Sequence, residues 1–165
     1  ISARYYNFAK TDGWVTSGAM GTMGFALPAA FGVKVAKPKR EAIAVIGDGC
    51  FQMTIQELGT IAQSKLPVKI IILNNNYLGM VRQWQQLFHD KRYSFVNITS
   101  PDFVALAKAY YIDGQKISER KDLKSALEAM LNHDGAYLLE VMVGKENNVF
   151  PMVAQGSSVS EIRLK

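Results

Sequence analysis

The chain has 165 residues, a length that favours one compact domain over two. Apolar residues make up 48% and charged residues 20%, which is typical of globular proteins and excludes a disordered chain. The net charge is +5, but the basic residues do not form a marked cluster. Their densest stretch, Lys34–Arg40, comes with no nucleic-acid-binding motif, so we expect no nucleic acid partner. The longest apolar run is far shorter than the roughly 18 residues that span a bilayer. No signal-peptide pattern opens the chain, and a single cysteine suits a reducing compartment, so we expect a cytoplasmic protein without membrane association.

Apolar runs alternate along the chain with helical patterns. The runs that predict strands are Trp14–Thr16, Ala42–Ile46, Val68–Leu73 and Ala136–Val143. The helical patterns are Thr22–Ala36, Thr54–Ser64, Pro101–Tyr110 with Ser100 as N-cap and Pro101 at the first helical position, and Lys121–Asn132. This alternation predicts an α/β fold of three layers (α/β/α) with a mainly parallel sheet. From Pro151 onward the periodicity is weak and predicts a surface extension.

Polar residues follow two of the predicted strands. Gly47-Asp48-Gly49 comes after the Ala42–Ile46 run, and three asparagines, Asn74 to Asn76, come after Val68–Leu73. In open α/β sheets ligands bind beyond the carboxyl ends of the strands, where these residues would meet. A carboxylate, an amide oxygen and a backbone carbonyl suit Mg²⁺, and the same ligands also accept Mn²⁺. Each motif alone is also compatible with a plain turn or a helix cap.

The two motifs together resemble the cofactor motif of thiamin diphosphate enzymes, which begins Gly-Asp-Gly and ends Asn-Asn. Here residues 50 to 73, 24 in number, separate Gly49 from Asn74. Further runs resemble the large catalytic subunit of acetolactate synthase (acetohydroxyacid synthase). These runs are residues 14–30, Gln56-Glu57-Leu58, Leu66-Pro67-Val68-Lys69 and residues 78–84 (LGMVRQW). The resemblance covers nearly the whole chain and is weakest between about Tyr93 and Arg120, and it implies the diphosphate-binding fold of these enzymes.

The resemblance also implies roles for single residues. Those that would hold Mg²⁺ are Asp48 and Asn75 through their side chains and Tyr77 through its carbonyl group. Those that would contact the diphosphate through backbone N–H groups are Gly49, Cys50 and Gly79. Those that would contact the aminopyrimidine ring are Gly21 and Met23, and those that would line the substrate channel are Met80, Val81 and Trp84. Cys50 stands where the family often has serine, and only its backbone is needed.

By the same resemblance the chain, residues 1–165, is the C-terminal diphosphate-binding domain of a larger enzyme. The glutamate that activates the cofactor and most of the FAD site would lie in other domains, so no catalytic residue is expected in this chain. The parent would decarboxylate pyruvate and join the two-carbon unit to pyruvate or 2-ketobutyrate, in branched-chain amino acid biosynthesis. A homodimer or tetramer and a small regulatory subunit are implied for it, while the domain alone is expected to be inactive.

Three other interpretations stay open. The first is another thiamin diphosphate enzyme, such as a 2-keto acid decarboxylase, pyruvate oxidase or glyoxylate carboligase. The second is a nicotinamide-binding domain, because Gly18, Gly21 and Gly24 precede a helix, although their spacing is not Gly-x-Gly-x-x-Gly. The third is a non-catalytic interaction module, against which the intact Asp48 and Asn75 argue. His89 and His133 belong to no motif and are interpreted as surface or structural residues.

Overall fold

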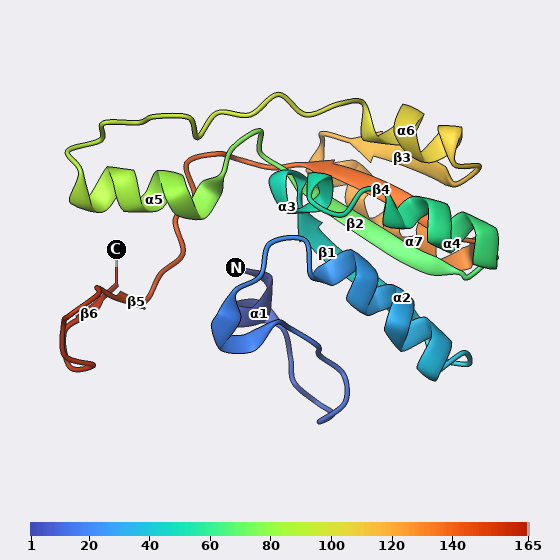
Figure 1. Ribbon diagram of the computed structural model, residues 1–165, viewed down its shortest axis with the longest axis horizontal. Coiled ribbons are helices and arrows are strands. Elements are labelled where there is room, and N and C mark those ends of the chain that lie inside the picture. Colours follow the sequence, from blue (N-terminus) through green and yellow to red (C-terminus); the bar gives the residue numbers. More distant parts are fainter. Residues whose placement is uncertain (165) are drawn as a thin grey trace.

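Four parallel strands form the central sheet in the order β1-β2-β4-β3 (Figure 1). The computed structural model describes residues 1–164. The strands are β1 (Ala42–Gly47), β2 (Val68–Asn74), β3 (Asp113–Ile117) and β4 (Tyr137–Met142). A short antiparallel pair, β5 (Met152–Val153) and β6 (Ile162–Arg163), lies apart from the sheet near the C-terminus. The sheet therefore has the parallel character that the sequence predicts.

Helices cover the two faces of the sheet unequally. The α-helices are α1 (Ser2–Tyr5), α2 (Ala26–Ala36), α3 (Asp48–Gln52), α4 (Glu57–Ser64), α5 (Gly79–Phe88), α6 (Phe103–Ala109) and α7 (Leu123–Asn132). Two 3₁₀ turns, η1 (Gly18–Met20) and η2 (Arg120–Asp122), complete the list. Side chains of α2, α3, α4 and α6 share the larger hydrophobic core with one face, while those of α7 pack on the other. The predicted three-layer α/β/α fold is confirmed.

The alternation of residues along each strand explains the two cores. Ile70, Ile72 and Leu138 belong to the larger core. Leu139, the residue after Leu138 on β4, points to the opposite face and packs with Met130 of α7 in the smaller core. Successive side chains of a strand point to opposite faces, so both faces of the central strands are buried and the strands appear in the sequence as continuous apolar runs.

The structure corrects several predicted boundaries. Residues 14–16 form no strand, and the fourth strand of the sheet is β3 instead. Helix α2 begins at Ala26 rather than Thr22, because Gly24 has a φ of +86°, which a right-handed helix cannot contain. The pattern from Thr54 yields a helix only from Glu57, and the last predicted helix begins at Leu123 after a 3₁₀ turn.

The cap of α6 also differs from the prediction. Asp102 is the N-cap, and its Oδ1 accepts a hydrogen bond of 2.9 Å from the N–H group of Ala105. Pro101 therefore lies before the helix, and Ser100 is free to contact another part of the chain. The hydroxyl group of Ser100 bonds to Asp48, which makes it a part of the candidate site rather than a cap.

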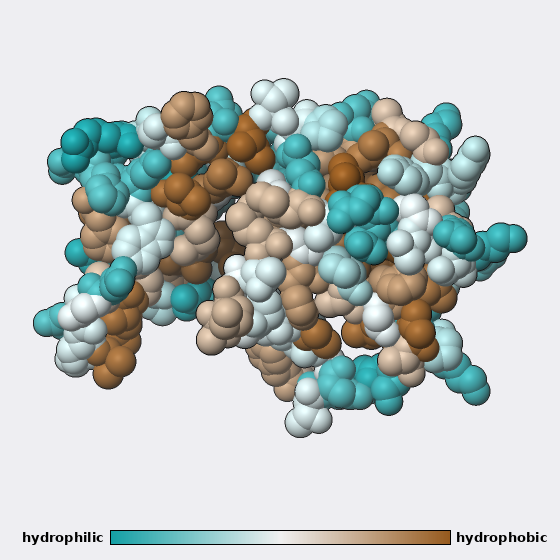
Figure 2. All heavy atoms as spheres, viewed as in Figure 1, coloured by the Kyte–Doolittle hydropathy of each residue, from teal (hydrophilic) through white to brown (hydrophobic). Residues whose placement is uncertain are grey.

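Helix α5 lies to one side of the sheet, next to the C-terminal segment (Figure 1). In the view of Figure 2, hydrophobic side chains surround a hollow between α5 and the helices that cover the sheet. Within residues 1–164, none of the helices has the length and apolar character that crossing a membrane requires.

Candidate cofactor site

The ends of β1 and β2 bring the predicted motifs together. The strands are neighbours, and Gly47 pairs in register with Leu73, so Asp48 and Asn74 leave the sheet side by side. Helix α3 starts at Asp48. The structure thus places the Gly-Asp-Gly turn beside the asparagine run, at the edge of the sheet where α/β proteins bind ligands.

Asp48 is a buried acid, with 2% of its surface exposed. Its Oδ2 accepts a hydrogen bond of 3.0 Å from the hydroxyl group of Ser100. Burial raises the pKa of the Asp48 carboxyl group because the charged form loses its hydration. The hydrogen bond from Ser100 lowers this pKa, and so, to a smaller extent, do the backbone N–H groups of Asp48, Gly49 and Asn75. An anion that is desolvated to this degree is stabilised further by a bound cation.

The asparagine run forms two consecutive side-chain turns. Oδ1 of Asn74 accepts from the N–H group of Asn76 at 3.0 Å, and Oδ1 of Asn75 accepts from that of Tyr77 at 3.0 Å. Asn76 has a φ of +56°, in the left-handed region that asparagine tolerates better than most residues. Because an amide oxygen has two lone pairs, Oδ1 of Asn75 can hold this turn and also coordinate a cation.

The segment 96–98 fixes the other side of this loop. Leu78 donates its N–H to the carbonyl of Val96 at 2.8 Å, and Ile98 donates to that of Asn76 at 3.0 Å. Tyr77 pairs with Asn97 as an isolated bridge. The backbone around Tyr77 is therefore held in place, as a carbonyl ligand requires.

Backbone N–H groups of Gly49 and Cys50 lie in the first turn of α3, where no side chain caps the helix. Such groups have no acceptor within the helix and are suited to bind an anion. A Cβ atom on Gly49 would come within 2.8 Å of Leu78 and 3.2 Å of Ile98, which explains the glycine. Gly79 starts α5, and its own Cβ position lies 3.5 Å from Nδ2 of Asn75. The starts of two helices therefore flank the acid and the amide.

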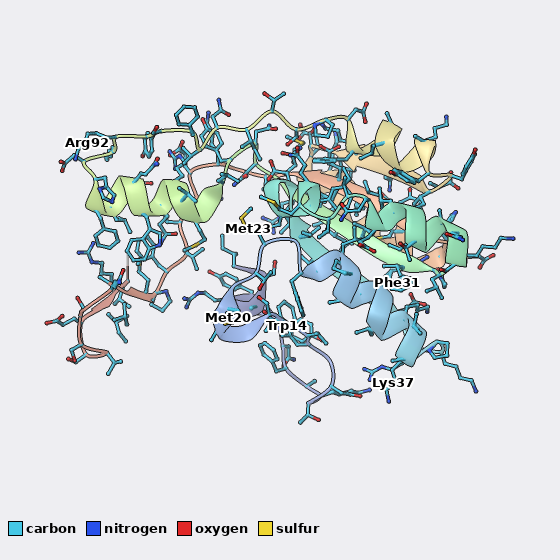
Figure 3. All side chains as sticks on the ribbon, viewed as in Figure 1. Trp14, Met20, Met23, Phe31, Lys37 and Arg92 are labelled. Carbon is cyan, nitrogen blue, oxygen red and sulfur yellow. The ribbon has the colours of Figure 1, made fainter. Side chains whose placement is uncertain are left out.

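The loop with Gly21 and Met23 lies on the N-terminal side of α2. Gly21 has a φ of +57°, and Met23 is 41% exposed. In the view of Figure 3, Met23 lies in the gap between α5 and α3. The Met23 side chain is thus partly exposed at the N-terminal side of α2.

Helix α5 carries the three residues predicted for the substrate channel. Met80 and Val81 are half-exposed, whereas Trp84 packs on Phe88 with 4.8 Å between ring centroids. A cavity of about 530 Å³ is lined by Val81, Trp84, Gln85, His89 and Arg92. His89 lies at this surface, while His133 is paired with Asp113 at 3.0 Å at the other end of the sheet, as a structural residue.

A second cavity, of about 410 Å³, lies along the outer edge of β1, between α2 and residues 12–15. It contains none of the residues predicted to bind the cofactor. The cavity is therefore separate from the candidate site at the strand ends.

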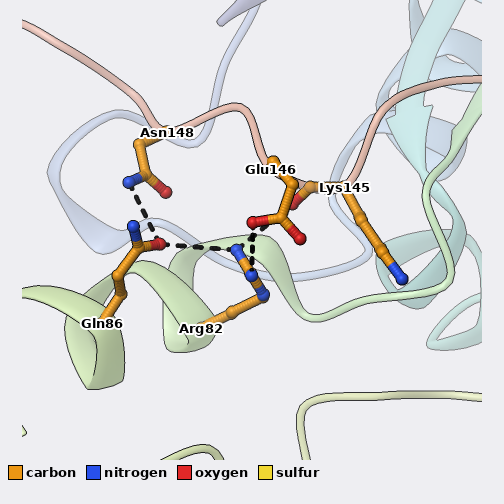
Figure 4. A network of polar contacts seen from close by, with 5 residues as sticks. All are labelled: Arg82, Gln86, Lys145, Glu146 and Asn148. Carbon is orange, nitrogen blue, oxygen red and sulfur yellow. Dashed lines mark hydrogen bonds and ion pairs between the residues drawn. The ribbon is translucent and has the colours of Figure 1, made fainter. Parts of the chain in front are cut away.

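Polar contacts join α5 to the segment that follows β4. Arg82 donates to Oε2 of Glu146 at 2.7 Å (Figure 4). Its guanidinium group also lies over the rings of Tyr77 and Tyr93. Gln83 exchanges two hydrogen bonds with the backbone of Val149, of 2.7 and 3.1 Å. These contacts hold the helix that presents Met80, Val81 and Trp84.

The donor atoms at the strand ends fit a hard cation. Within residues 1–164 no three His, Cys, Asp or Glu side chains gather, so a metal would depend on amide and carbonyl oxygens beside Asp48. Such an all-oxygen set suits Mg²⁺, which keeps waters and phosphate oxygens in its shell. The arrangement can therefore hold a divalent cation together with a diphosphate.

Sequence reasoning missed two polar residues near the site, Ser100 and Glu140. Ser100 was assigned to a helix cap, and Glu140 lies inside an apolar run, where it bonds to Asn74 at 2.7 Å. A charged residue in the middle of such a run is the one signal that could have drawn attention to Glu140.

The parallel sheet, with an acid and amides at the ends of two neighbouring strands, defines an α/β domain whose polar groups gather at the edge where such folds bind ligands. Residues 1–141 match the family described as thiamine pyrophosphate enzyme, C-terminal TPP binding domain. The chain belongs to this family of thiamin diphosphate-binding domains.

Known proteins similar to the chain include several acetolactate synthases. It is 47% identical over 165 residues to the acetolactate synthase isozyme 2 large subunit of Escherichia coli (strain K12), covering 99% of this chain and 30% of that subunit. It is 48% identical over 151 residues to the acetolactate synthase large subunit of Cyanidium caldarium, covering 90% of this chain and 26% of that subunit. A solved structure of the thiamine diphosphate-dependent 4-hydroxybenzoylformate decarboxylase of Rhodococcus jostii RHA1 superposes with a TM-score of 0.71 at 36% identity, covering 76% of this chain and 24% of that one. The chain thus spans 30% or less of the length of these proteins.

Proposed function

We propose that the chain is the C-terminal domain of an acetolactate synthase and that it holds the diphosphate of thiamin diphosphate through Mg²⁺. The observation that carries this proposal is the meeting of buried Asp48 with the Asn74–Tyr77 loop at the ends of neighbouring strands. The relatives named acetolactate synthase, at 47% and 48% identity, support the choice of enzyme.

Each predicted residue has a role in this proposal. The cation is held by the side chains of Asp48 and Asn75 and by the carbonyl group of Tyr77. The diphosphate is bound by N–H groups of Gly49, Cys50 and Gly79, and the aminopyrimidine by Gly21 and Met23. The substrate side is formed by Met80, Val81 and Trp84.

When bound, thiamin diphosphate supplies an electron sink for decarboxylation of a 2-keto acid and for joining the remaining carbons to a second one. The residues of this chain bind and orient the cofactor. Asp48 balances the charge of the cation, and the starts of α3 and α5 place N–H groups toward the diphosphate. The apolar side chains of α5 exclude water from the substrate side.

The remaining properties concern the whole enzyme. We infer a parent that uses pyruvate and 2-ketobutyrate, holds FAD mostly through another domain, and assembles as a homodimer or tetramer with a small regulatory subunit. A single cysteine is compatible with a cytoplasmic protein. We expect no acetolactate synthase activity from residues 1–165 alone. Turnover by this chain that disappears in Asp48→Ala would contradict that expectation.

The test is a calorimetric titration with thiamin diphosphate, with and without Mg²⁺, of the chain and of the full-length protein. Binding should require both Mg²⁺ and Asp48, so Asp48→Ala should abolish it. Asp12→Ala is a matched control, because Asp12 is an exposed acid that pairs with Arg40. Full-length protein that binds no thiamin diphosphate at any Mg²⁺ concentration would refute the cofactor assignment.

A second candidate is a thiamin diphosphate-dependent 2-keto acid decarboxylase, which the similarity to the Rhodococcus jostii RHA1 enzyme favours. Product analysis of the full-length protein with pyruvate separates the two functions. Acetolactate supports the synthase, whereas acetaldehyde as the main product supports a decarboxylase.

A further inference from the structure

Glu140 is a carboxylate in the middle of the sheet, on β4, with no exposed surface. Its Oε1 accepts a hydrogen bond from Nδ2 of Asn74 at 2.7 Å and forms an ion pair with Nζ of Lys116 at 3.0 Å. Its Oε2 is buried and has no hydrogen-bond partner among the described residues. A buried carboxylate with an unpaired oxygen destabilises the fold. Its presence here therefore points to a role that an apolar residue could not fill.

The neighbours of Glu140 lead to the candidate cation site. Asn74 is the last residue of β2 and is itself buried. Glu140 can only accept a hydrogen bond from it, so the NH₂ end of the Asn74 amide must face β4. The carbonyl end is thereby turned away from β4, and there it accepts from the N–H group of Asn76. One side chain thus connects the acid inside the sheet to the turn outside it.

The turn fixed in this way contains both loop residues that we assign to the cation. Asn75 precedes Asn76 and Tyr77 follows it, and Oδ1 of Asn75 is bonded to the N–H group of Tyr77. A rotation of the Asn74 amide would remove the acceptor of Asn76 and free the backbone between these residues. The orientation of Asn74 is therefore coupled to the geometry of two of the three ligands.

We propose that Glu140 is a positioning residue for the cation site: it orients the Asn74 amide, which holds the loop that presents Asn75 and Tyr77. This inference rests on the proposed function, because it concerns the same Mg²⁺ and diphosphate site. Lys116, on the neighbouring strand β3, is half-exposed and balances the buried charge. Residues that orient metal ligands through hydrogen bonds typically change metal affinity about 10–100-fold when replaced.

The test reverses the polarity of the contact in the full-length protein. Asn74→Asp places two carboxylates face to face but keeps an acceptor for Asn76. Glu140→Gln keeps the size and an acceptor oxygen but removes the charge. The double variant, with both substitutions, restores a donor and an acceptor and has the net charge of the wild type. Lys124→Met is the matched control, since it removes an exposed lysine that pairs with Glu128 on α7 and leaves the contact between Glu140 and Asn74 in place.

The measurements are the Kd of thiamin diphosphate at fixed Mg²⁺, by calorimetry, and the Tm of each variant without ligand. We expect Asn74→Asp to raise the Kd about 10–100-fold and Glu140→Gln to raise it less, while Lys124→Met stays close to the wild type. The double variant should bind more tightly than Asn74→Asp alone, because the donor–acceptor pair is restored.

Several results would overturn the inference. Tighter binding by Asn74→Asp would mean that charge near the cation matters rather than orientation. A double variant no tighter than Asn74→Asp, or an equally large loss in Lys124→Met, would exclude an action through Asn74. Lowered Tm values with unchanged Kd values would leave Glu140 a purely structural role. A wild type that binds no cofactor refutes the proposed function itself, and that result is distinct from the others.

Discussion

Thr54 donates a hydrogen bond of 2.9 Å from its Oγ1 to the carbonyl oxygen of Gly24. The bond joins two segments that the proposed cofactor would contact at different ends. Gly24 follows the loop with Met23, and Thr54 follows α3, which carries Gly49. The relative position of the two binding segments therefore depends on this contact.

We expect Thr54→Val to destabilise the fold by about 1 kcal/mol, because it removes the donor and keeps the shape. The Kd of thiamin diphosphate should rise as well, since the two segments become less firmly joined. Urea unfolding and calorimetry measure the two effects. Thr54→Ser retains the hydroxyl group and should keep the affinity of the wild type, and a loss as large as that of Thr54→Val would contradict this explanation.

Gly49→Ala is expected to destabilise the protein by about 1–3 kcal/mol, as overpacked side chains do. Its Cβ atom would lie 2.8 Å from Leu78 and 3.2 Å from Ile98, so both side chains must move. Gly47→Ala is the control, because no atom lies within 4 Å of its Cβ position and its φ of −77° suits alanine. The free energy of unfolding should separate the two variants, and equal stabilities would show that the contact at Gly49 relaxes freely.

Gln83→Leu should release the segment around Val149 from α5. The variant loses both hydrogen bonds to the Val149 backbone, so the amide proton of Val149 should exchange with solvent faster. Gln86→Leu is the control, since Gln86 contacts side chains of this region but not the backbone of Val149 (Figure 4). Hydrogen exchange at Val149 that is the same in the two variants would contradict the proposed attachment.

Lys69 makes stability depend on pH. Its buried ammonium group donates to the carbonyl groups of His133 and Gly135, the latter at 2.7 Å. Burial lowers the pKa of Lys69 below its ordinary value of 10.5. The unfolded chain therefore holds the proton more tightly, and the contribution of Lys69 to the free energy of unfolding should rise as pH rises from the folded pKa toward 10.5.

Lys69→Met isolates this contribution. Urea unfolding at a series of alkaline pH values gives the free energy of unfolding of the wild type and of the variant. The value of the wild type should increase relative to that of the variant as the pH rises. Parallel curves would mean that Lys69 has the same pKa in both states.

Three of the four strands of the sheet could be predicted because each is a continuous apolar run in the sequence. Strands β2 and β4 are buried on both faces, whereas Ile43 and Val45 of β1, at the edge of the sheet, are partly exposed. Strand β3 could not be predicted, since it pairs only with β4 and carries polar residues such as Gln115 and Lys116 at the edge of the sheet. The start of α2 was misplaced because the left-handed φ of Gly24 is not visible in an otherwise helical, alanine-rich pattern.

The candidate site also has a part that could be predicted from the sequence and a part that could not. Asp48 and the asparagine run could be singled out because each lies at the end of a strand and parallel strands end at one edge, whereas Asn75 in particular was assigned through the resemblance to thiamin diphosphate enzymes. The contacts of Ser100 with Asp48 and of Glu140 with Asn74 join residues 52 and 66 positions apart. Their existence depends on how loops and strands meet in space, which local patterns do not determine.

The order of the strands has a consequence for how the chain assembles. Strand β4 is the last strand of the sheet in the sequence, yet it lies between β2 and β3. Until residues 137–142 are synthesised and inserted, β2 has an open edge and the Asn74 amide lacks its acceptor on β4. The contact that orients Asn74 therefore forms only after β4 has joined the sheet, and a ribosome-bound chain that stops before β4 lacks this part of the candidate site.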